Sequence, residues 1–207
     1  MIIAVDGPAA SGKGTLARRI AAHFEYAYLD TGKIYRAVGQ SVLNLGEDPE
    51  NLEAALRAAR ELDPSELGNP DLERDSAAIA ASKVATLKPV RAVLLDFQKS
   101  FAVSPPGGAK GAVLDGRDIG TVVCPDANVK LFVTADVEER ARRRHKELLD
   151  KGEPSIYPRV LEALKDRDAR DSSRSAAPLK AAADAILIDT TLMDPDEAFA
   201  KALGYIQ

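Results

Sequence analysis

The chain has 207 residues, of which 45% are hydrophobic, so it can close one sizeable core but is too short for two enzymatic domains of ordinary size. Its formal net charge of −4 argues against general adhesion to nucleic acid, because such binding needs a broad basic face. The single cysteine, Cys124, excludes an intramolecular disulfide, and two histidines beside it do not favour a structural zinc site. No apolar run has the length of a signal peptide or a membrane span, so we expect a cytoplasmic protein without a membrane partner.

Short apolar segments rich in β-branched residues alternate with helical patterns along the chain. After the first segment, Leu16, Ile20 and Phe24 recur at a spacing of four, as on one face of a helix. Strands separated by helices indicate right-handed crossovers, and therefore an α/β fold with a parallel sheet covered by helices on both faces. The predicted core strands are residues 2–6, 27–30, 111–115, 129–135 and 185–189 of a single domain that spans 1–207.

The first predicted strand ends at Asp6 and leads directly into a glycine loop, after which a helical pattern begins. Glycines let successive backbone N–H groups point inward, the helix N-terminus adds partial positive charge, and Lys13 can reach the β- and γ-phosphates of a nucleotide. The spacing of Gly7, Gly12 and Lys13 is that of a P-loop. A hydroxyl residue usually follows the lysine and holds magnesium; because Gly14 stands there, we expect Mg²⁺ to depend more on an acidic residue and water. The predicted ATP-binding residues of the loop are Gly7, Pro8, Ala9, Ala10, Ser11, Gly12, Lys13, Gly14 and Thr15.

Three other interpretations fit parts of this loop. It can be a glycine-rich turn with an exposed lysine. Residues 12–17 also match the dinucleotide-binding pattern G-x-G-x-x-A, with Asp30 near the place of a ribose-binding acid, although Gly12 does not follow the strand directly as that pattern requires. A GTP-driven switch is disfavoured, because the chain has no Asn-Lys-x-Asp sequence to select guanine.

The second predicted strand ends in a segment that can form a second anion site. It runs Asp30-Thr-Gly-Lys-Ile-Tyr-Arg36, so the Thr31 hydroxyl and the Arg36 guanidinium can hold one monophosphate facing the P-loop. Taken alone, Thr31 fits a helix N-cap equally well, and Arg36 fits a solvated helix charge.

The third predicted strand ends in the charged run Asp115-Gly-Arg-Asp-Ile-Gly-Thr121. Asp115 has the position of the acid that orders Mg²⁺ and its water shell in P-loop enzymes. A buried charged trio needs partners, and the alternative without a ligand is a mutual salt bridge between Arg117 and Asp118.

The motifs of this chain resemble, in the same order, the signatures of the bacterial cytidylate kinases. They are GPAASGKGT, LDTGKIYR, DGRDIGTVV and the block from Asp166 to Arg174, followed by Ala-Pro-Leu at 177–179. The similarity covers nearly the whole chain, and the last two motifs are more discriminating than the P-loop. The resemblance implies a P-loop kinase with sheet order 2-3-1-4-5 that transfers the γ-phosphoryl group of ATP to CMP or dCMP, with Mg²⁺ as cofactor, and we expect a monomer.

The resemblance also implies roles for individual residues. The implied catalytic residues are Lys13, Asp115, Arg117, Arg167 and Arg174. The implied CMP-binding residues are Thr31, Arg36, Ser82, Arg91, Arg117, Asp118, Arg167, Asp171 and Arg174. Arg140 and Arg143, near the start of a lid of about residues 140–174, would contact the phosphates or adenine of ATP, and the acceptor-binding segment would span about residues 31–110.

These implied contacts suit the chemistry of cytosine. A carboxylate such as Asp118 can accept the amino hydrogens at N4, while Arg91 and Ser82 donate to the acceptors at N3 and O2. Uracil would present a carbonyl to that carboxylate. A buried mispaired polar group costs about 1 to 3 kcal/mol, which gives roughly tenfold to a few hundredfold discrimination.

The arginines near residue 170 have two interpretations from their pattern alone. Arg167, Arg170 and Arg174 fall at i, i+3 and i+7 with Asp171 between them, as in a salt-bridged surface helix. Phosphoryl transfer, however, needs positive groups around the equatorial oxygens of the transferred group and no covalent nucleophile. We find no general base in the sequence, and we interpret the two histidines as helix-surface residues.

One segment departs from the longer members of the family, which carry a small antiparallel sheet in the acceptor-binding region. Between helical patterns ending near Leu62 and beginning near Arg74, residues 63–73 contain two prolines, a glycine and no alternating apolar pattern. Three paired strands need about five residues each plus turns, so we predict a short irregular connection without a sheet. Kinases of another monophosphate, UMP or AMP, and non-catalytic nucleotide-binding proteins remain the alternative functions.

Overall fold

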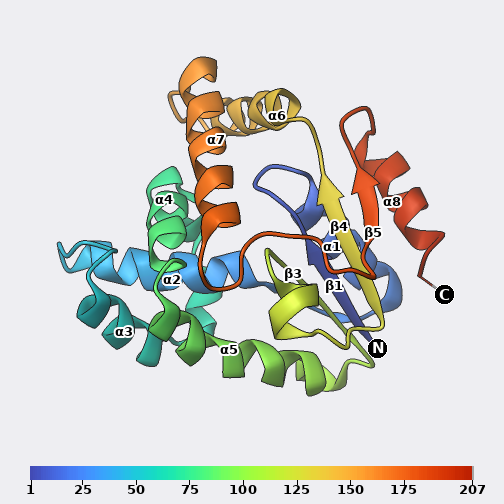
Figure 1. The fold of residues 1–207 in the computed structure, drawn as a ribbon, viewed down its shortest axis with the longest axis horizontal. Coiled ribbons are helices and arrows are strands. Elements are labelled where there is room, and N and C mark those ends of the chain that lie inside the picture. Colours follow the sequence, from blue (N-terminus) through green and yellow to red (C-terminus); the bar gives the residue numbers. More distant parts are fainter. Residues whose placement is uncertain (207) are drawn as a thin grey trace.

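The computed structural model describes residues 1–206 and contains one sheet of five parallel strands (Figure 1). The strand order is β2-β3-β1-β4-β5, which confirms the predicted α/β fold and sheet order. Val5 of β1 pairs with Asp115 of β3 on one side and Leu131 of β4 on the other, so the carboxyl ends of these strands meet at one edge. The strands are β1 Ile2–Asp6, β2 Ala27–Asp30, β3 Ala112–Gly116, β4 Val129–Thr134 and β5 Ile186–Asp189.

Helices connect the strands and pack on both faces of the sheet. Side chains alternate between the faces along β1: Ile3 and Val5 pack against α1 and α8, while Ala4 faces the side of α2 and α5. The helices are α1 Lys13–Phe24, α2 Thr31–Asn44, α3 Leu52–Arg60, α4 Asp75–Val84, α5 Lys88–Val103, α6 Val137–Asp150, α7 Tyr157–Ser173 and α8 Pro195–Leu203. One apolar core therefore packs on each face of the sheet. The edge where the carboxyl ends of the strands meet is free to form a site.

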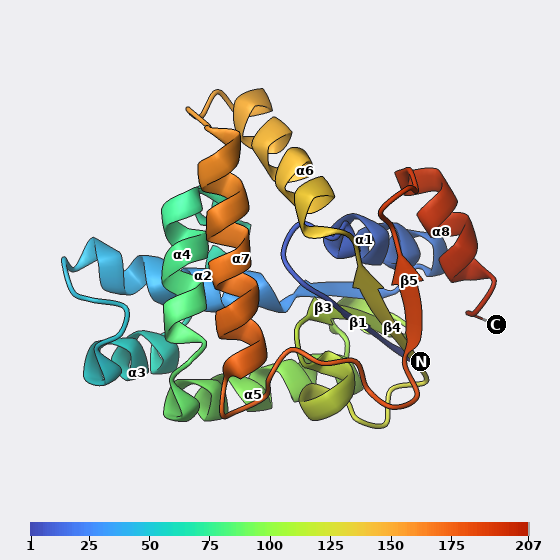
Figure 2. The same cartoon turned by 45° about the horizontal axis from the view of Figure 1, so that its top comes forward.

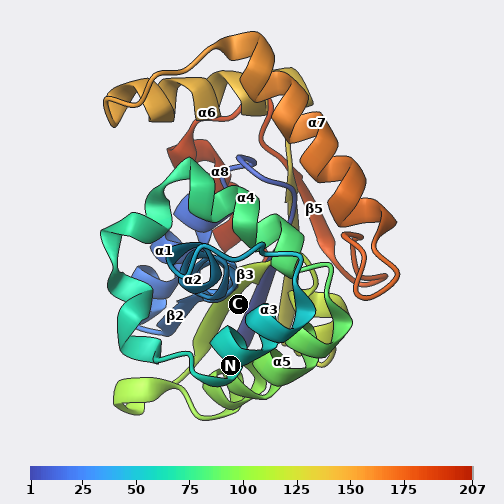
Figure 3. The same ribbon diagram turned by 90° about the vertical axis from the view of Figure 1, so that its left-hand side faces the viewer.

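Two groups of helices extend beyond the sheet. Helices α2, α3 and α4 form an arm on one side, and α6 and α7 form a pair that follows β4 (Figure 2). A view rotated by 90° shows the α6–α7 pair arching over the rest of the molecule, with α7 close to α4 (Figure 3). The arm lies within the predicted acceptor segment and the pair within the predicted lid, although the division into these segments stays a prediction.

Residues 63–73 contain no strand, as predicted, but they are more regular than expected. They form two 3₁₀ helices, η1 Pro64–Gly68 and η2 Pro70–Glu73. The Asp63 side chain accepts the N–H of Ser65, and the Asn69 side chain accepts the N–H of Asp71, so each short helix has a side-chain cap and a proline at its start. Within residues 1–206, no helix combines the length and the apolar character that crossing a membrane requires.

Candidate active site

The P-loop connects β1 to α1 and closes around the carboxyl end of β1. Gly7 has φ 151°, and a Cβ at this position would lie 2.0 Å from the carbonyl oxygen of Val133 on the neighbouring strand β4. Only glycine permits this approach of loop and strand backbones. Ser11 is fully buried, and its Oγ has no hydrogen-bond partner within residues 1–206. An unpaired buried hydroxyl in a glycine loop is the kind of group that a bound phosphate satisfies.

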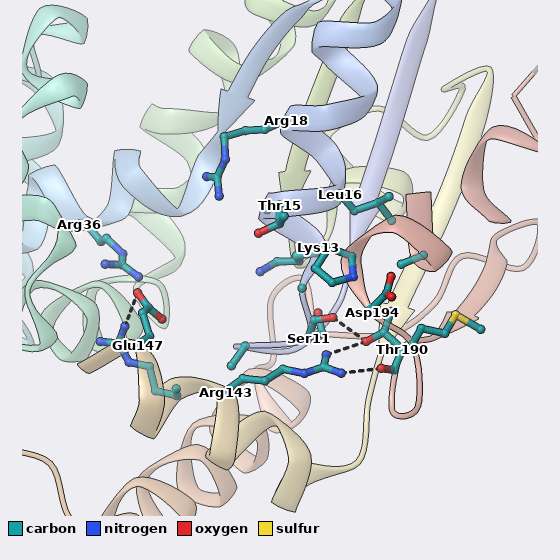
Figure 4. Close-up of a pocket in the computed structure, with 17 residues that line it drawn as sticks. Ser11, Lys13, Thr15, Leu16, Arg18, Arg36, Arg143, Glu147, Thr190 and Asp194 are labelled. Carbon is teal, nitrogen blue, oxygen red and sulfur yellow. Dashed lines mark hydrogen bonds and ion pairs between the residues drawn. The ribbon is translucent and has the colours of Figure 1, made fainter. Parts of the chain in front are cut away.

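A cavity of about 490 Å³ lies beside the P-loop, and Figure 4 shows the side chains that line it. Lys13 lies on one wall, and Arg143 extends from α6 toward the segment after β5. The Arg143 guanidinium donates to Thr190 through both terminal nitrogens, at 3.0 Å to the hydroxyl and 2.6 Å to the carbonyl oxygen. The Thr190 hydroxyl in turn donates to the carbonyl oxygen of Ser11 at 2.9 Å. These bonds join α6, the P-loop and the segment after β5 into one wall.

Arg140, the other predicted lid contact, is held differently. It is buried, and its three side-chain nitrogens donate to the carbonyl oxygens of Ala135 and Ala9 and to the carboxylate of Asp168, the last at 2.7 Å. It does not line the 490 Å³ cavity. In this conformation Arg140 therefore fastens the P-loop backbone to α6 and α7, and its nucleotide contact stays a prediction.

Lys13 lies at the junction between this cavity and a second, smaller one, and Asp115 lines the smaller one. Burial, together with the nearby Arg117 charge, lowers the pKa of Lys13 to about 8. Burial and the neighbouring Asp30 carboxylate raise the pKa of Asp115 to about 6. Burial destabilises the charged forms of both Lys13 and Asp115. A ligand that brings phosphate to Lys13 and a cation to Asp115 would stabilise both charges.

The second cavity has a volume of about 120 Å³ and is lined by residues from five separate segments of the chain. Every residue that the sequence implied for binding CMP lies on its wall, so the structure brings the whole predicted set together. These residues are Thr31, Arg36, Ser82, Arg91, Arg117, Asp118, Arg167, Asp171 and Arg174.

The wall of this cavity carries a buried ion pair and an unpaired hydroxyl. Arg91 of α5 and Asp118 of the segment after β3 lie 2.5 Å apart, and the Arg91 guanidinium also lies 5.4 Å from the centre of the Tyr35 ring. The Ser82 Oγ of α4 is buried and has no hydrogen-bond partner within residues 1–206. The interpretation of Arg117 and Asp118 as a mutual salt bridge is wrong, because the two side chains pair with different partners.

Asp171 lies among three arginines on the wall of the same cavity. Its carboxylate lies 2.9 Å from Nε of Arg117, 3.9 Å from Arg174 and 4.0 Å from Arg167. Burial opposes ionisation of Asp171, but these three arginines outweigh it and hold its pKa below the ordinary value. Asp171 is only 3% exposed, so the alternative of a salt-bridged surface helix is wrong for this part of α7.

Thr31 and Arg36 lie on α2, the first helix of the arm, and line the smaller cavity. The N-cap of α2 is Asp30, whose carboxylate accepts the N–H of Lys33, so Thr31 is not the cap. The Thr31 hydroxyl donates to the carbonyl oxygen of Asp115 at 2.7 Å, and Arg36 donates to the carbonyl oxygen of Leu72 at 2.7 Å. Arg36 borders both cavities, as the view of the larger one shows (Figure 4).

Several residues around the cavities were missed from the sequence. Asp6 is buried at the end of β1 and accepts the backbone N–H groups of Ile119 and Gly120, which fixes the turn that follows Arg117 and Asp118. Burial raises its pKa to about 6. Thr190 follows β5 at the carboxyl edge of the sheet, where ligands bind in open α/β folds, and that rule was sufficient to nominate it. Arg18, Arg144, Glu147 and Met193 also line the larger cavity, and no motif marks them.

A parallel sheet whose first strand leads into a P-loop, with a second cavity rich in arginine beside it, defines a P-loop phosphotransferase that acts on a small anionic acceptor. The family model for cytidylate kinase matches residues 3–207. The chain is 62% identical to a cytidylate kinase of Paramagnetospirillum magneticum, over 99% of this chain and 97% of the relative, and 58% identical to one of Rhodospirillum rubrum, over 100% and 97%. The chain belongs to the cytidylate kinase family and is thus a nucleoside monophosphate kinase.

Solved structures support the fold at lower similarity. The chain resembles an uncharacterized protein of Eubacterium ventriosum with a TM-score of 0.56 at 18% identity, covering 100% of this chain and 97% of that one. The family assignment overturns the interpretations of the glycine loop as a bare turn or as a dinucleotide-binding turn.

Proposed function

We propose that the protein transfers the γ-phosphoryl group of ATP to CMP or dCMP, giving ADP and CDP or dCDP. The observation that carries this proposal is the set of polar groups on the wall of the 120 Å³ cavity. The Asp118 carboxylate, the Arg91 guanidinium and the unpaired Ser82 hydroxyl offer one acceptor and two donors, which complement the amino group and the acceptors of cytosine.

The acceptor phosphate is assigned to the arginines around Asp171 in the same cavity. Arg117, Arg167 and Arg174 surround the Asp171 carboxylate there, and Arg36 approaches from the arm. An acceptor dianion would compensate positive charges that Asp171 alone does not balance. Burial and the charge of Arg117 lower the pKa of Arg167 to about 9, which reflects this excess of positive charge.

ATP is assigned to the larger cavity. The P-loop backbone and Lys13 would hold its phosphates, and the wall formed by Arg143 and Thr190 would border its adenosine part. The transferred group then passes between the two cavities at Lys13, which lines both. No covalent nucleophile is needed, because positioning and positive charge supply the catalysis in phosphoryl transfer.

A magnesium ion fits the residues at this junction when it is held through its water shell. Within residues 1–206, no cluster of three or more acidic, histidine or cysteine side chains offers direct ligation, whereas Asp115 presents a buried carboxylate beside Lys13. The ion would neutralise charge on the ATP phosphates as they react. Both cavities are built from one chain, so we further propose that the enzyme works as a monomer. We also propose that it is cytoplasmic, as expected from its sequence.

A coupled assay of ADP release tests this assignment. The purified chain is given ATP and Mg²⁺ with CMP, dCMP, UMP, AMP or GMP, and kcat/KM is compared among the acceptors. We expect CMP and dCMP to exceed UMP by roughly tenfold to a few hundredfold. A higher kcat/KM for UMP or AMP would assign the enzyme to another monophosphate.

A further inference from the structure

Tyr28 of β2 contacts the carboxylate of Asp115, which lines the smaller cavity. Its phenol donates to Oδ2 of Asp115 at 2.7 Å across the neighbouring strands β2 and β3. Neither the motifs nor the family resemblance singled out this tyrosine. Asp115 is only 2% exposed, so the bond lies in surroundings where a hydrogen bond to a charged group is strong.

The bond fixes which oxygen of Asp115 is available. Within residues 1–206 the Asp115 side chain accepts its hydrogen bond only at Oδ2, and Oδ1 has no such partner. Its backbone is fixed as well, because the Thr31 hydroxyl donates to the Asp115 carbonyl oxygen. Asp115 is therefore held once at its carboxylate and once at its backbone, and the carboxylate oxygen without a partner remains for a ligand.

The P-loop is shaped around this bond. A Cβ at Gly14 would lie 3.2 Å from Oδ2 of Asp115 and 3.8 Å from the phenol oxygen of Tyr28. Position 14 is where P-loops usually carry the hydroxyl residue that helps to hold magnesium. The glycine leaves room for the carboxylate, and the phenol from β2 brings a hydroxyl group to the same place.

From this geometry we infer that Tyr28 is a positioning residue for the magnesium of the reaction, acting through Asp115. The inference rests on the proposed function, because it concerns the metal that accompanies ATP. Tyr28 holds the Asp115 carboxylate so that Oδ1 meets the water shell of the ion.

The test is ATP binding by calorimetry, with and without Mg²⁺, for Tyr28→Phe and its control. Tyr26→Phe is the matched control, because the Tyr26 hydroxyl contacts Met1 Sδ, and that tyrosine stacks on Phe24. We expect the factor by which Mg²⁺ tightens ATP binding to fall at least threefold in Tyr28→Phe and to stay unchanged in Tyr26→Phe. We also expect the Mg²⁺ concentration for half-maximal activity to rise at least threefold in Tyr28→Phe alone.

A double-mutant cycle separates this role from a general packing effect. In an Asp115→Asn background, Tyr28→Phe should change the Mg²⁺ factor no further, because the two residues act as one unit. If Tyr28→Phe does not fold, Gly14→Ala tests the same carboxylate, since its Cβ crowds Oδ2 and should lower the Mg²⁺ factor as well.

Two results overturn the inference. One is an equal Mg²⁺ factor in wild type and Tyr28→Phe, and the other is a wild-type protein that binds ATP equally with and without Mg²⁺. Either result, in a wild-type chain that still phosphorylates CMP, leaves the proposed function intact. Failure of the wild type to phosphorylate CMP contradicts the proposed function instead.

Discussion

Lys13 is a positively charged residue of the P-loop. It lines both the larger cavity, assigned to ATP, and the smaller cavity, assigned to CMP. We predict that Lys13→Ala folds normally but lowers kcat by a large factor, about a hundredfold or more, because the lysine meets phosphate charge that grows in the transition state. Thermal unfolding checks the fold, and steady-state kinetics measure the loss. Near wild-type kcat in the folded variant would contradict the role assigned to Lys13.

Asp118 carries the prediction about base selectivity. Asp118→Ala should lower kcat/KM for CMP by roughly tenfold to a few hundredfold and leave the value for UMP nearly unchanged, because only cytosine loses its acceptor. Asp71→Ala is the matched control: Asp71 forms an exposed ion pair with Arg74 and borders neither cavity. If the ratio of CMP to UMP is the same in Asp118→Ala and wild type, the cytosine-edge assignment is wrong.

Asp6 makes stability depend on pH. Its pKa of about 6 in the folded protein exceeds the ordinary value of 3.8, so the folded state binds this proton more tightly than the unfolded state. The contribution of Asp6 to the free energy of unfolding is on the order of 2 to 3 kcal/mol. It is fully present below about pH 4 and is lost as the pH rises to about 6. The free energy of unfolding of wild type, relative to that of Asp6→Asn, should therefore fall between pH 4 and pH 6 and stay level above that. Urea unfolding across this range measures it, and a difference independent of pH would refute the prediction.

At the scale of elements, the connection between α3 and α4 distinguishes this chain from the longer members that its sequence resembles. The connection consists of two capped 3₁₀ helices, where the longer members were expected to carry a sheet, and all nine residues assigned to CMP lie outside residues 63–73. We predict that CMP phosphorylation survives while closure of the arm on binding CMP is smaller than in a family member that carries the sheet. Small-angle scattering of both proteins with and without CMP compares the change in radius of gyration. An equal or larger contraction in this chain would contradict the prediction.

The same scale shows how much the sequence could predict. The strands and their order were predicted, because apolar β-branched runs alternate with helical patterns and the motifs follow in family order. Seven of the nine residues assigned to CMP lie in those motifs, whereas Ser82 and Arg91 lie outside them and were implied by the family resemblance alone. Asp6 and Tyr28 were missed because their roles depend on contacts with segments far along the chain, and nothing local marks such a contact. Thr190 was missed although its place directly after β5, at the carboxyl edge of the sheet, was sufficient to nominate it.

At the scale of the whole molecule, function depends on bringing distant segments to one edge of the sheet. The carboxyl ends of the parallel strands lie at one edge of the sheet. The P-loop after β1, helix α2 after β2 and the charged run after β3 therefore become neighbours. The arm and the α6–α7 pair then supply groups from above, such as Ser82 and Arg143. Exclusion of water between these parts would direct the phosphoryl group to the acceptor rather than to hydrolysis.

The fate of that phosphoryl group is the most direct test of the account. The purified chain is incubated with ATP, Mg²⁺ and CMP, and the nucleotides are separated and quantified by anion-exchange chromatography. We predict that CDP and ADP accumulate in equal amounts and that little ADP forms when CMP is omitted. ADP formation without CDP, or no reaction with CMP, would contradict the account.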